Sequence, residues 1–263
     1  MRNQTTFFTL ILLFLLPLSH LNAKSQTVVL QVNESLPIWS QKLPFGGMGS
    51  EIIQAISKEV NMDTRIDFIP LKRLIADTTN NDIGNPLFYM DKQEFAAIIP
   101  IAVSYNSFFA YKNDINSLLL NSKGKPIRVG VLKGTAQNMS SKLAYLEESS
   151  SHQSLFKKLK VGRIDLVLEL DLVGKNIINN DKGFTSSIID NSSSPIAILL
   201  DINYPNAEAI ALEYKKGLDI IIKNGTYQKI LDKYYTNKSL PPNWYRDLSK
   251  FNMIYSIDYK GSN

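Results

Sequence analysis

Charged and polar groups near the ends of predicted strands could hold the charged groups of a small molecule. Gly134 and Thr135 follow the apolar segment 127–132 and precede a predicted helix, so backbone N–H groups and a hydroxyl are available there to bind a carboxylate. Arg73 follows the strand segment 65–69, and a guanidinium can hold a carboxylate through two parallel hydrogen bonds. Each has a structural alternative: Thr135 can simply cap its helix, and Arg73 can lie on a solvated helix face.

Acidic side chains follow two other predicted strands. Glu169 and Asp171 come just after the apolar segment 164–168, where a carboxylate could meet a ligand ammonium group. Either residue could instead cap the helix that follows. Glu34 lies just beyond the first strand and could accept a hydrogen bond from a ligand amine.

Four aromatic side chains lie in or beside loops at predicted strand ends, where open α/β sheets place their ligands. Aromatic walls around an apolar or cationic group are expected in such sites. Trp39 is the strongest candidate of the four, although each of them could equally belong to core or surface packing. The four residues are Trp39, Phe45, Tyr89 and Tyr105.

Composition excludes several kinds of chemistry. The 263 residues include no cysteine, which removes disulfides, a cysteine nucleophile, a zinc–thiolate site, an iron–sulfur cluster and a lipid anchor on an N-terminal cysteine. Two histidines, His20 and His152, leave little room for a metal cluster or a hydrolytic triad. The net charge of +5 is mildly basic, but no segment concentrates Lys and Arg as nucleic-acid binding requires.

The N-terminus has the pattern of a secretory signal peptide. Arg2 precedes an apolar block, Phe7 to Ser19, that is too short to span a membrane, and small Ala23 follows at a suitable cleavage position. We therefore expect residues 1–23 to be removed and the remainder to be exported to a periplasm. An uncleaved membrane anchor is the alternative.

Apolar periodicity predicts alternating strands and helices in two runs. The polar segment 112–125 separates them and is predicted to be a linker, and a helix is expected from Thr135 to about Tyr145. Residues 186–194 are predicted to be a loop, and 238–263 a tail after two final helices. This alternation favours α/β lobes.

Several motifs, in this order, resemble those of the family 3 extracellular solute-binding proteins, the receptors of polar amino-acid uptake systems in bacteria. They are FIPLKR, VGVLKGT, LKVGRID and KNGTYQKILDKYY, and the resemblance covers essentially the whole chain after residue 23. It implies an α/β periplasmic binding protein-like type II fold, in which two lobes are joined by a two-strand hinge and close over a small ligand. The expected first lobe comprises residues 24–111 and 203–263, and the second comprises 112–202.

The resemblance implies capture of an amino acid or related carboxylate, without turnover or cofactor, by a monomer that serves an ABC permease or a sensor in the inner membrane. It also points to the Thr135 position as a carboxylate contact. Amino-acid receptors of this family usually carry a second arginine where this chain has YMDKQEFAAIIP, with Lys92 and Gln93. Arg73 or Lys92 would then act in its place, or the ligand differs.

A second hypothesis is an enzyme on the same fold, similar to a cyclohexadienyl dehydratase. Such an enzyme needs an acid or base at the site, and Glu34, Glu169 and Asp171 are the candidates. A ligand-sensing partner of a signalling receptor is a third hypothesis.

Overall fold

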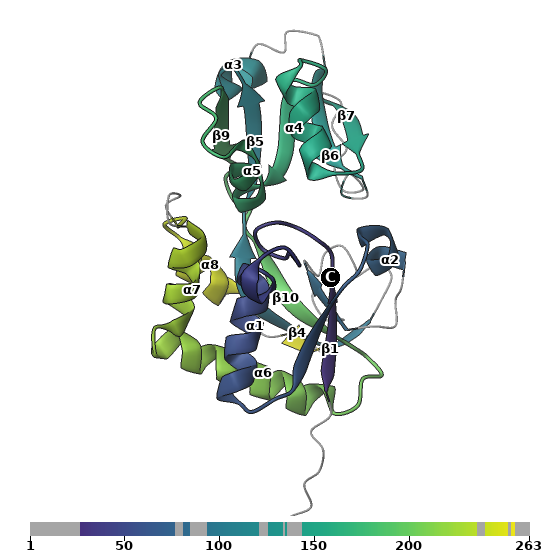
Figure 1. Ribbon diagram of the computed structural model, residues 1–263, viewed down its shortest axis with the longest axis vertical. Helices are drawn as coiled ribbons and strands as arrows, with labels where there is room; N and C mark the ends of the chain where they lie inside the picture. Colours follow the sequence, from purple (N-terminus) through teal and green to yellow (C-terminus); the bar gives the residue numbers. More distant parts are fainter. Residues whose placement is uncertain are drawn as a thin grey trace, which may run out of the picture.

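The alternating strands and helices form two separate sheets, and each sheet is the centre of one lobe (Figure 1). The computed structural model describes residues 27–76, 81–84, 94–120, 126–133, 135, 144–235, 240–251 and 254–255. The predicted signal peptide, Lys92, Tyr89 and the strand expected at 86–89 therefore lie outside the described residues.

The first sheet has six strands in the order β11-β4-β10-β3-β1-β2. Strands β1, β2 and β3 run parallel, whereas β10 is antiparallel to both β3 and β4. Every second residue of β1 is fully buried, as expected for an apolar β-branched segment at the centre of a lobe. The strands are β1 (Val28–Val32), β2 (Thr64–Phe68), β3 (Asp82–Gly84), β4 (Phe95–Ser104), β10 (Ser194–Asp201) and β11 (Ile254–Tyr255).

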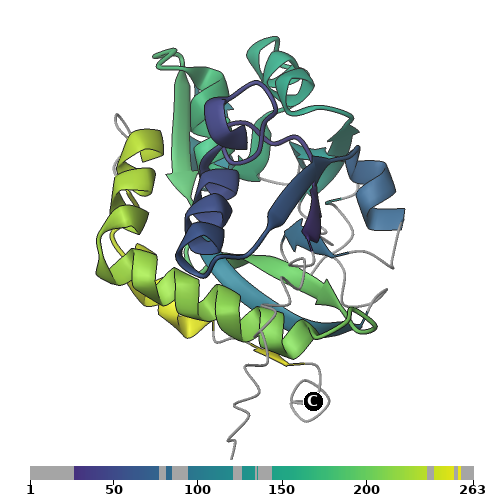
Figure 2. The same cartoon turned by 60° about the horizontal axis from the view of Figure 1, so that its bottom comes forward.

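Helices α1, α6 and α7 gather on one side of this sheet, away from α2 (Figure 2). Helix α1 buries Ile52, Ile53 and Ile56, which recur at helical spacing and face the same core as β1. The helical elements of this lobe are η1 (Pro44–Gly46), α1 (Met48–Glu59), α2 (Leu71–Ala76), α6 (Ala207–Lys223), α7 (Thr226–Tyr235) and α8 (Trp244–Lys250).

The second sheet has five strands in the order β7-β6-β8-β5-β9. Strand β6 is parallel to β7 and β8, and β5 is antiparallel to β8 and β9. The strands are β5 (Asn106–Tyr111), β6 (Ile127–Leu132), β7 (Ala144–Ser149), β8 (Leu166–Leu170) and β9 (Phe184–Ile188), and the helices are α3 (Ile115–Leu120), α4 (His152–Lys160) and α5 (Asp171–Ile178).

Within the described residues, the chain passes between the sheets twice. Tyr105 alone separates β4 of the first sheet from β5 of the second, and residues 189–193 return the chain from β9 to β10. Hydrogen bonds join the two passages: Ile189 N–H donates to the Asn106 carbonyl at 2.9 Å, and the hydroxyls of Ser104 and Ser194 lie 3.1 Å apart.

These passages differ from the junctions expected at 112 and 202, because β5 belongs to the second sheet and β10 to the first. The passage at Tyr105 could not be predicted from composition. Buried strands flank Tyr105 directly, so the chain changes sheets without a polar linker that would mark the place. The described part of the polar segment 112–125 instead contains α3, and residues 121–125 lie outside the described residues.

Four local predictions need correction. The segment 112–125 contains a helix, α3, and the segment 186–194 contributes to β9 and β10. The helix expected to reach Tyr145 does not do so, because Ala144–Ser149 forms strand β7 beside β6; residues 136–143 lie outside the described residues. The predicted tail contains α8, whose Trp244 is fully buried against the first lobe.

In the described parts of the chain no helix is both long enough and apolar enough to cross a membrane.

Candidate functional site

The parallel strands of the second lobe end at the edge of their sheet that lies next to the passages. Strand β8 ends at Leu170, and the N–H of the following residue, Asp171, donates to the Tyr105 carbonyl at 2.8 Å. Strand β6 is parallel to β8, and β7 to β6, so all three strands end at this edge.

The first lobe presents the same kind of edge to the passages. Strand β10 begins there at Ser194, which is paired with Ser104. In β3, Gly84 pairs with Ala197 and Asp82 with Leu199, so Gly84 is the end of β3 nearer to the passages. Strand β3 therefore runs towards the passages, and β1 and β2 run parallel to it. Ligands of open α/β sheets bind outside the carboxyl ends of strands, so the two edges together define the candidate site.

At the edge of the second lobe, Glu169 forms a buried pair with His152. The Nδ1 atom of His152 lies 2.5 Å from Glu169 Oε2, and Glu169 Oε1 accepts a hydrogen bond of 2.9 Å from the Leu170 N–H. The His152 side chain is 15% exposed and that of Glu169 6%. Burial lowers the pKa of His152, but the hydrogen bond and the negative charge of Glu169 outweigh burial and raise it above the ordinary value.

His152 was not singled out as a site residue from the sequence. It is the first residue of α4, directly after the cap Ser151, whose side chain accepts from the Ser154 N–H. The available signal was the presence of a single histidine in the chain after residue 23, but its proximity to Glu169 depends on how β7, α4 and β8 pack.

Asp171 occupies the first turn of α5 and is almost completely buried. Its Oδ1 accepts from the Ser107 hydroxyl, and its Oδ2 pairs with Lys175 Nζ, both at 2.8 Å. Both carboxylate oxygens are therefore engaged within the second lobe, close to Tyr105.

Thr135 lies in a bend after β6. Its N–H and its hydroxyl both donate to the Leu132 carbonyl, at 3.0 and 2.7 Å, so its hydroxyl closes this turn. Gly134 lies outside the described residues, as does the segment that would show whether a helix follows directly.

Arg73 extends from α2 at the carboxyl end of β2, and its side chain is exposed. Among the described residues no hydrogen bond or ion pair engages its guanidinium. Figure 1 shows α2, and the loop that follows β1, on the side of the first lobe nearer to the second. Glu34 in that loop is exposed, and its carboxylate accepts hydrogen bonds from the Ser40 hydroxyl and from the Gln41 N–H.

Trp39 lies in the core of the first lobe with 5% of its surface exposed. The indole packs over Gly49, where an added Cβ would fall 2.0 Å from Trp39 Cη2. The structure therefore shows the packing role that the sequence left as an alternative. Phe45 is exposed, with Lys233 Nζ 4.9 Å from its ring centroid.

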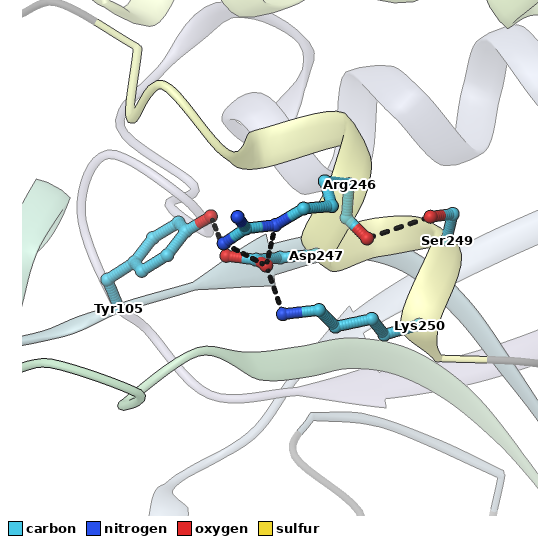
Figure 3. A network of polar contacts seen from close by, with 5 residues as sticks. All are labelled: Tyr105, Arg246, Asp247, Ser249 and Lys250. Atoms are coloured by element: carbon cyan, nitrogen blue, oxygen red, sulfur yellow. Dashed lines mark hydrogen bonds and ion pairs between the residues drawn. The ribbon is translucent and has the colours of Figure 1, made fainter.

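Tyr105, the residue between β4 and β5, is also buried and holds α8 against the first passage. Its hydroxyl donates to Asp247 Oδ2 at 2.9 Å, while Lys250 and Arg246 contact Asp247 Oδ1 (Figure 3). The Lys250 hydrogen bond, although opposed by burial, lowers the pKa of Asp247, and those from Tyr105 and Arg246 add to this effect. Burial and the hydrogen bond to Asp247 raise the pKa of Tyr105.

Within the described residues, no group of three or more His, Cys, Asp or Glu side chains could hold a metal ion. Arg73 is exposed and has no partner among the described residues, and a guanidinium can hold a carboxylate through hydrogen bonds.

Two α/β lobes linked by two short passages have the periplasmic-binding type II fold. The chain is structurally similar to a substrate-binding protein of an amino acid ABC transporter, with a TM-score of 0.63, 18% identity, and coverage of 80% of this chain and 100% of that one. No protein-family model and no curated protein sequence matches the chain.

Two further solved structures show the same fold. The arginine-, lysine-, histidine-binding protein ArtJ from Geobacillus stearothermophilus has a TM-score of 0.64 and 18% identity, over 83% of this chain and 98% of that one. A histidine kinase sensor domain with similarity to periplasmic binding proteins has a TM-score of 0.64 and 15% identity, over 80% and 96% of the two chains.

Proposed function

We propose that this protein is a periplasmic solute-binding protein that captures a small polar ligand between the carboxyl edges of its two sheets. The observation that carries the proposal is the strand direction: the parallel strands of both lobes end beside the two passages. Bending at Tyr105 and at residues 189–193 would bring the two edges together over the ligand.

Arg73 is the first-lobe residue best suited to hold a ligand carboxylate. Its guanidinium is exposed at the edge and has no partner among the described side chains, so it can form a bidentate pair without breaking a contact to any of them. Thr135, Glu34 and Asp171 stay secondary candidates, since their side chains already bond within the protein.

The ligand class is an amino acid or a related carboxylate, and a membrane permease or a sensor would receive the closed form. The structural similarity to a transporter substrate-binding protein supports a permease partner, and the similarity to a kinase sensor domain supports a sensor partner equally well. Export of the chain after residue 23 would place it in the compartment where such partners act.

Isothermal titration of the chain from residue 24 against amino acids and small carboxylates, with scattering in parallel, tests the proposal. We expect micromolar-range binding to at least one solute, accompanied by compaction. Arg73→Ala should weaken binding without altering the unfolding midpoint. Arg65→Ala is the matched control, because Arg65 is also exposed but pairs with Asp67 on β2. Absence of binding to every polar solute would refute the proposal.

One observation favours a second candidate, an enzyme on this fold. A histidine oriented by a carboxylate is a common general acid–base arrangement, and His152 with Glu169 has it. Steady product formation from prephenate or arogenate would establish this activity, whereas stoichiometric binding without turnover would remove it.

A further inference from the structure

We propose that His152, oriented by Glu169, is a specificity-determining contact of the second lobe, and that it selects an acidic group on the ligand. Together with Arg73 it would select a small ligand with two acidic groups, one for each lobe. This inference rests on the proposed function and names the substrate class of the same site.

Glu169 already has two partners inside the protein. One carboxylate oxygen faces His152 Nδ1 at 2.5 Å, and the other accepts from a backbone N–H at 2.9 Å. The Glu169 side chain is only 6% exposed, and its free acceptor sites lie behind the imidazole and the backbone, so a ligand ammonium has little access to it. The Glu169 carboxylate is therefore not the group that this edge presents.

The imidazole of His152 is the partner of Glu169 that a ligand can reach at this edge. Because Nδ1 faces the carboxylate, it carries the proton, and Nε2 is left for another partner. No hydrogen bond within the described residues engages Nε2, and the side chain keeps 15% of its surface exposed. A protonated imidazole presents an Nε2–H donor, which forms a charge-assisted hydrogen bond with a carboxylate.

The surroundings of His152 support the protonated form. Glu169 raises the pKa of His152 against the opposing effect of burial. Several other charged groups lie on elements packed against α4. Glu147 of β7 pairs with Lys158, Arg128 of β6 pairs with Asp165, and Asp171 of α5 pairs with Lys175. Glu148 of β7 is exposed to solvent. Glu169 of β8 is therefore the charged group that acts on the ring, among the residues the structure describes.

His152 of the second lobe and Arg73 of the first could contact the same ligand. His152 lies where β7 leads into α4, at the carboxyl edge of the second sheet, and Arg73 lies at the corresponding edge of the first. Closure would bring two positively charged donors towards one ligand. Such a pair favours dicarboxylates and acidic amino acids, and it disfavours ligands whose side chain is cationic.

Titration calorimetry with four probes tests the inference: L-glutamate, succinate, L-alanine and L-arginine, each at pH 6 and pH 8. We expect L-glutamate or succinate to bind more tightly than the other two probes, and more tightly at pH 6. His152→Gln should weaken that binding about 10- to 100-fold, the size of one charge-assisted hydrogen bond, and should remove the pH dependence. Gln153→Ala is the control, because Gln153 is the exposed neighbour of His152 on α4.

A second variant covers the case in which His152→Gln fails to fold. Glu169→Gln keeps the imidazole but removes the charge that favours its protonation, so tight binding should persist only at lower pH. Three results would overturn the inference: equal affinity of wild type and His152→Gln for the acidic probes, binding that does not depend on pH, or a preference for L-arginine or another non-acidic solute. Each of them would leave the solute-binding function standing. If the protein binds none of the solutes tested, both the proposed function and this inference are refuted.

Discussion

The hydroxyl of Tyr105 donates a hydrogen bond of 2.9 Å to Asp247, so the single residue of the first passage between the sheets is attached to helix α8. Trp244 of the same helix reinforces this attachment, with its ring centroid 6.2 Å from that of Tyr105. The sequence after residue 240 therefore supports the passage between the lobes in addition to covering the first lobe.

Tyr105→Phe should lower the free energy of unfolding by about 1 to 3 kcal/mol, because it removes a buried hydrogen bond to a charged acceptor. Urea denaturation measures the change. Tyr245→Phe on the same helix is the control: Tyr245 is exposed and bonds to Gln228 on the surface, so its loss should cost less than about 0.5 kcal/mol. Equal effects of the two substitutions would contradict a special role for Tyr105.

Asp247 should make the protein more stable at neutral than at acidic pH. The pKa of Asp247 is lower in the folded protein than its ordinary value of about 3.9, so its contribution is complete above that value and is lost as pH falls through the folded pKa. Urea denaturation between pH 7 and pH 3 should show a shallower decline for Asp247→Asn than for the wild type. Parallel curves would show that Asp247 contributes nothing to acid sensitivity.

The His152–Glu169 pair should act in the opposite direction. The folded-state pKa of His152 is raised, so the stabilisation is complete below the unfolded value of about 6.5 and is lost as pH rises through the folded pKa. Thermal unfolding of the chain from residue 24 at pH 6 to 9 should show this loss. His152→Gln should flatten the profile, and a profile that keeps its slope would assign the loss to other groups.

Gly49→Ala should destabilise the first lobe by about 1 to 3 kcal/mol through overpacking, because the new Cβ would meet the Trp39 ring at 2.0 Å. In a Trp39→Phe background, Gly49→Ala should lower the free energy of unfolding by less than it does in the wild type, since the smaller ring leaves room for the methyl group. Additive losses in the double-mutant cycle would mean that the two positions do not compete for space.

The role of Trp39 could not be predicted from the sequence around it. An aromatic residue near a strand end fits either a ligand wall or a core, and the loop path decides between them. Here Ser35 and Trp39 exchange backbone hydrogen bonds, which turns the indole onto Gly49. Pro37 lies inside this turn and favours it, but the local sequence does not specify that the indole packs on Gly49.

The sequence by itself determined most elements of the fold: apolar periodicity identified β1, α1, β6, α4 and α6, and motif order indicated two α/β lobes. These features are local, since they follow from residue spacing along one strand or helix. Only the tertiary structure decided where the chain changes sheets, and which acidic groups stay available. Tyr105 joins two buried strands without a polar linker, and Glu169 is matched by His152 from another element. Both relationships arise from the packing of distant segments, which no local pattern encodes.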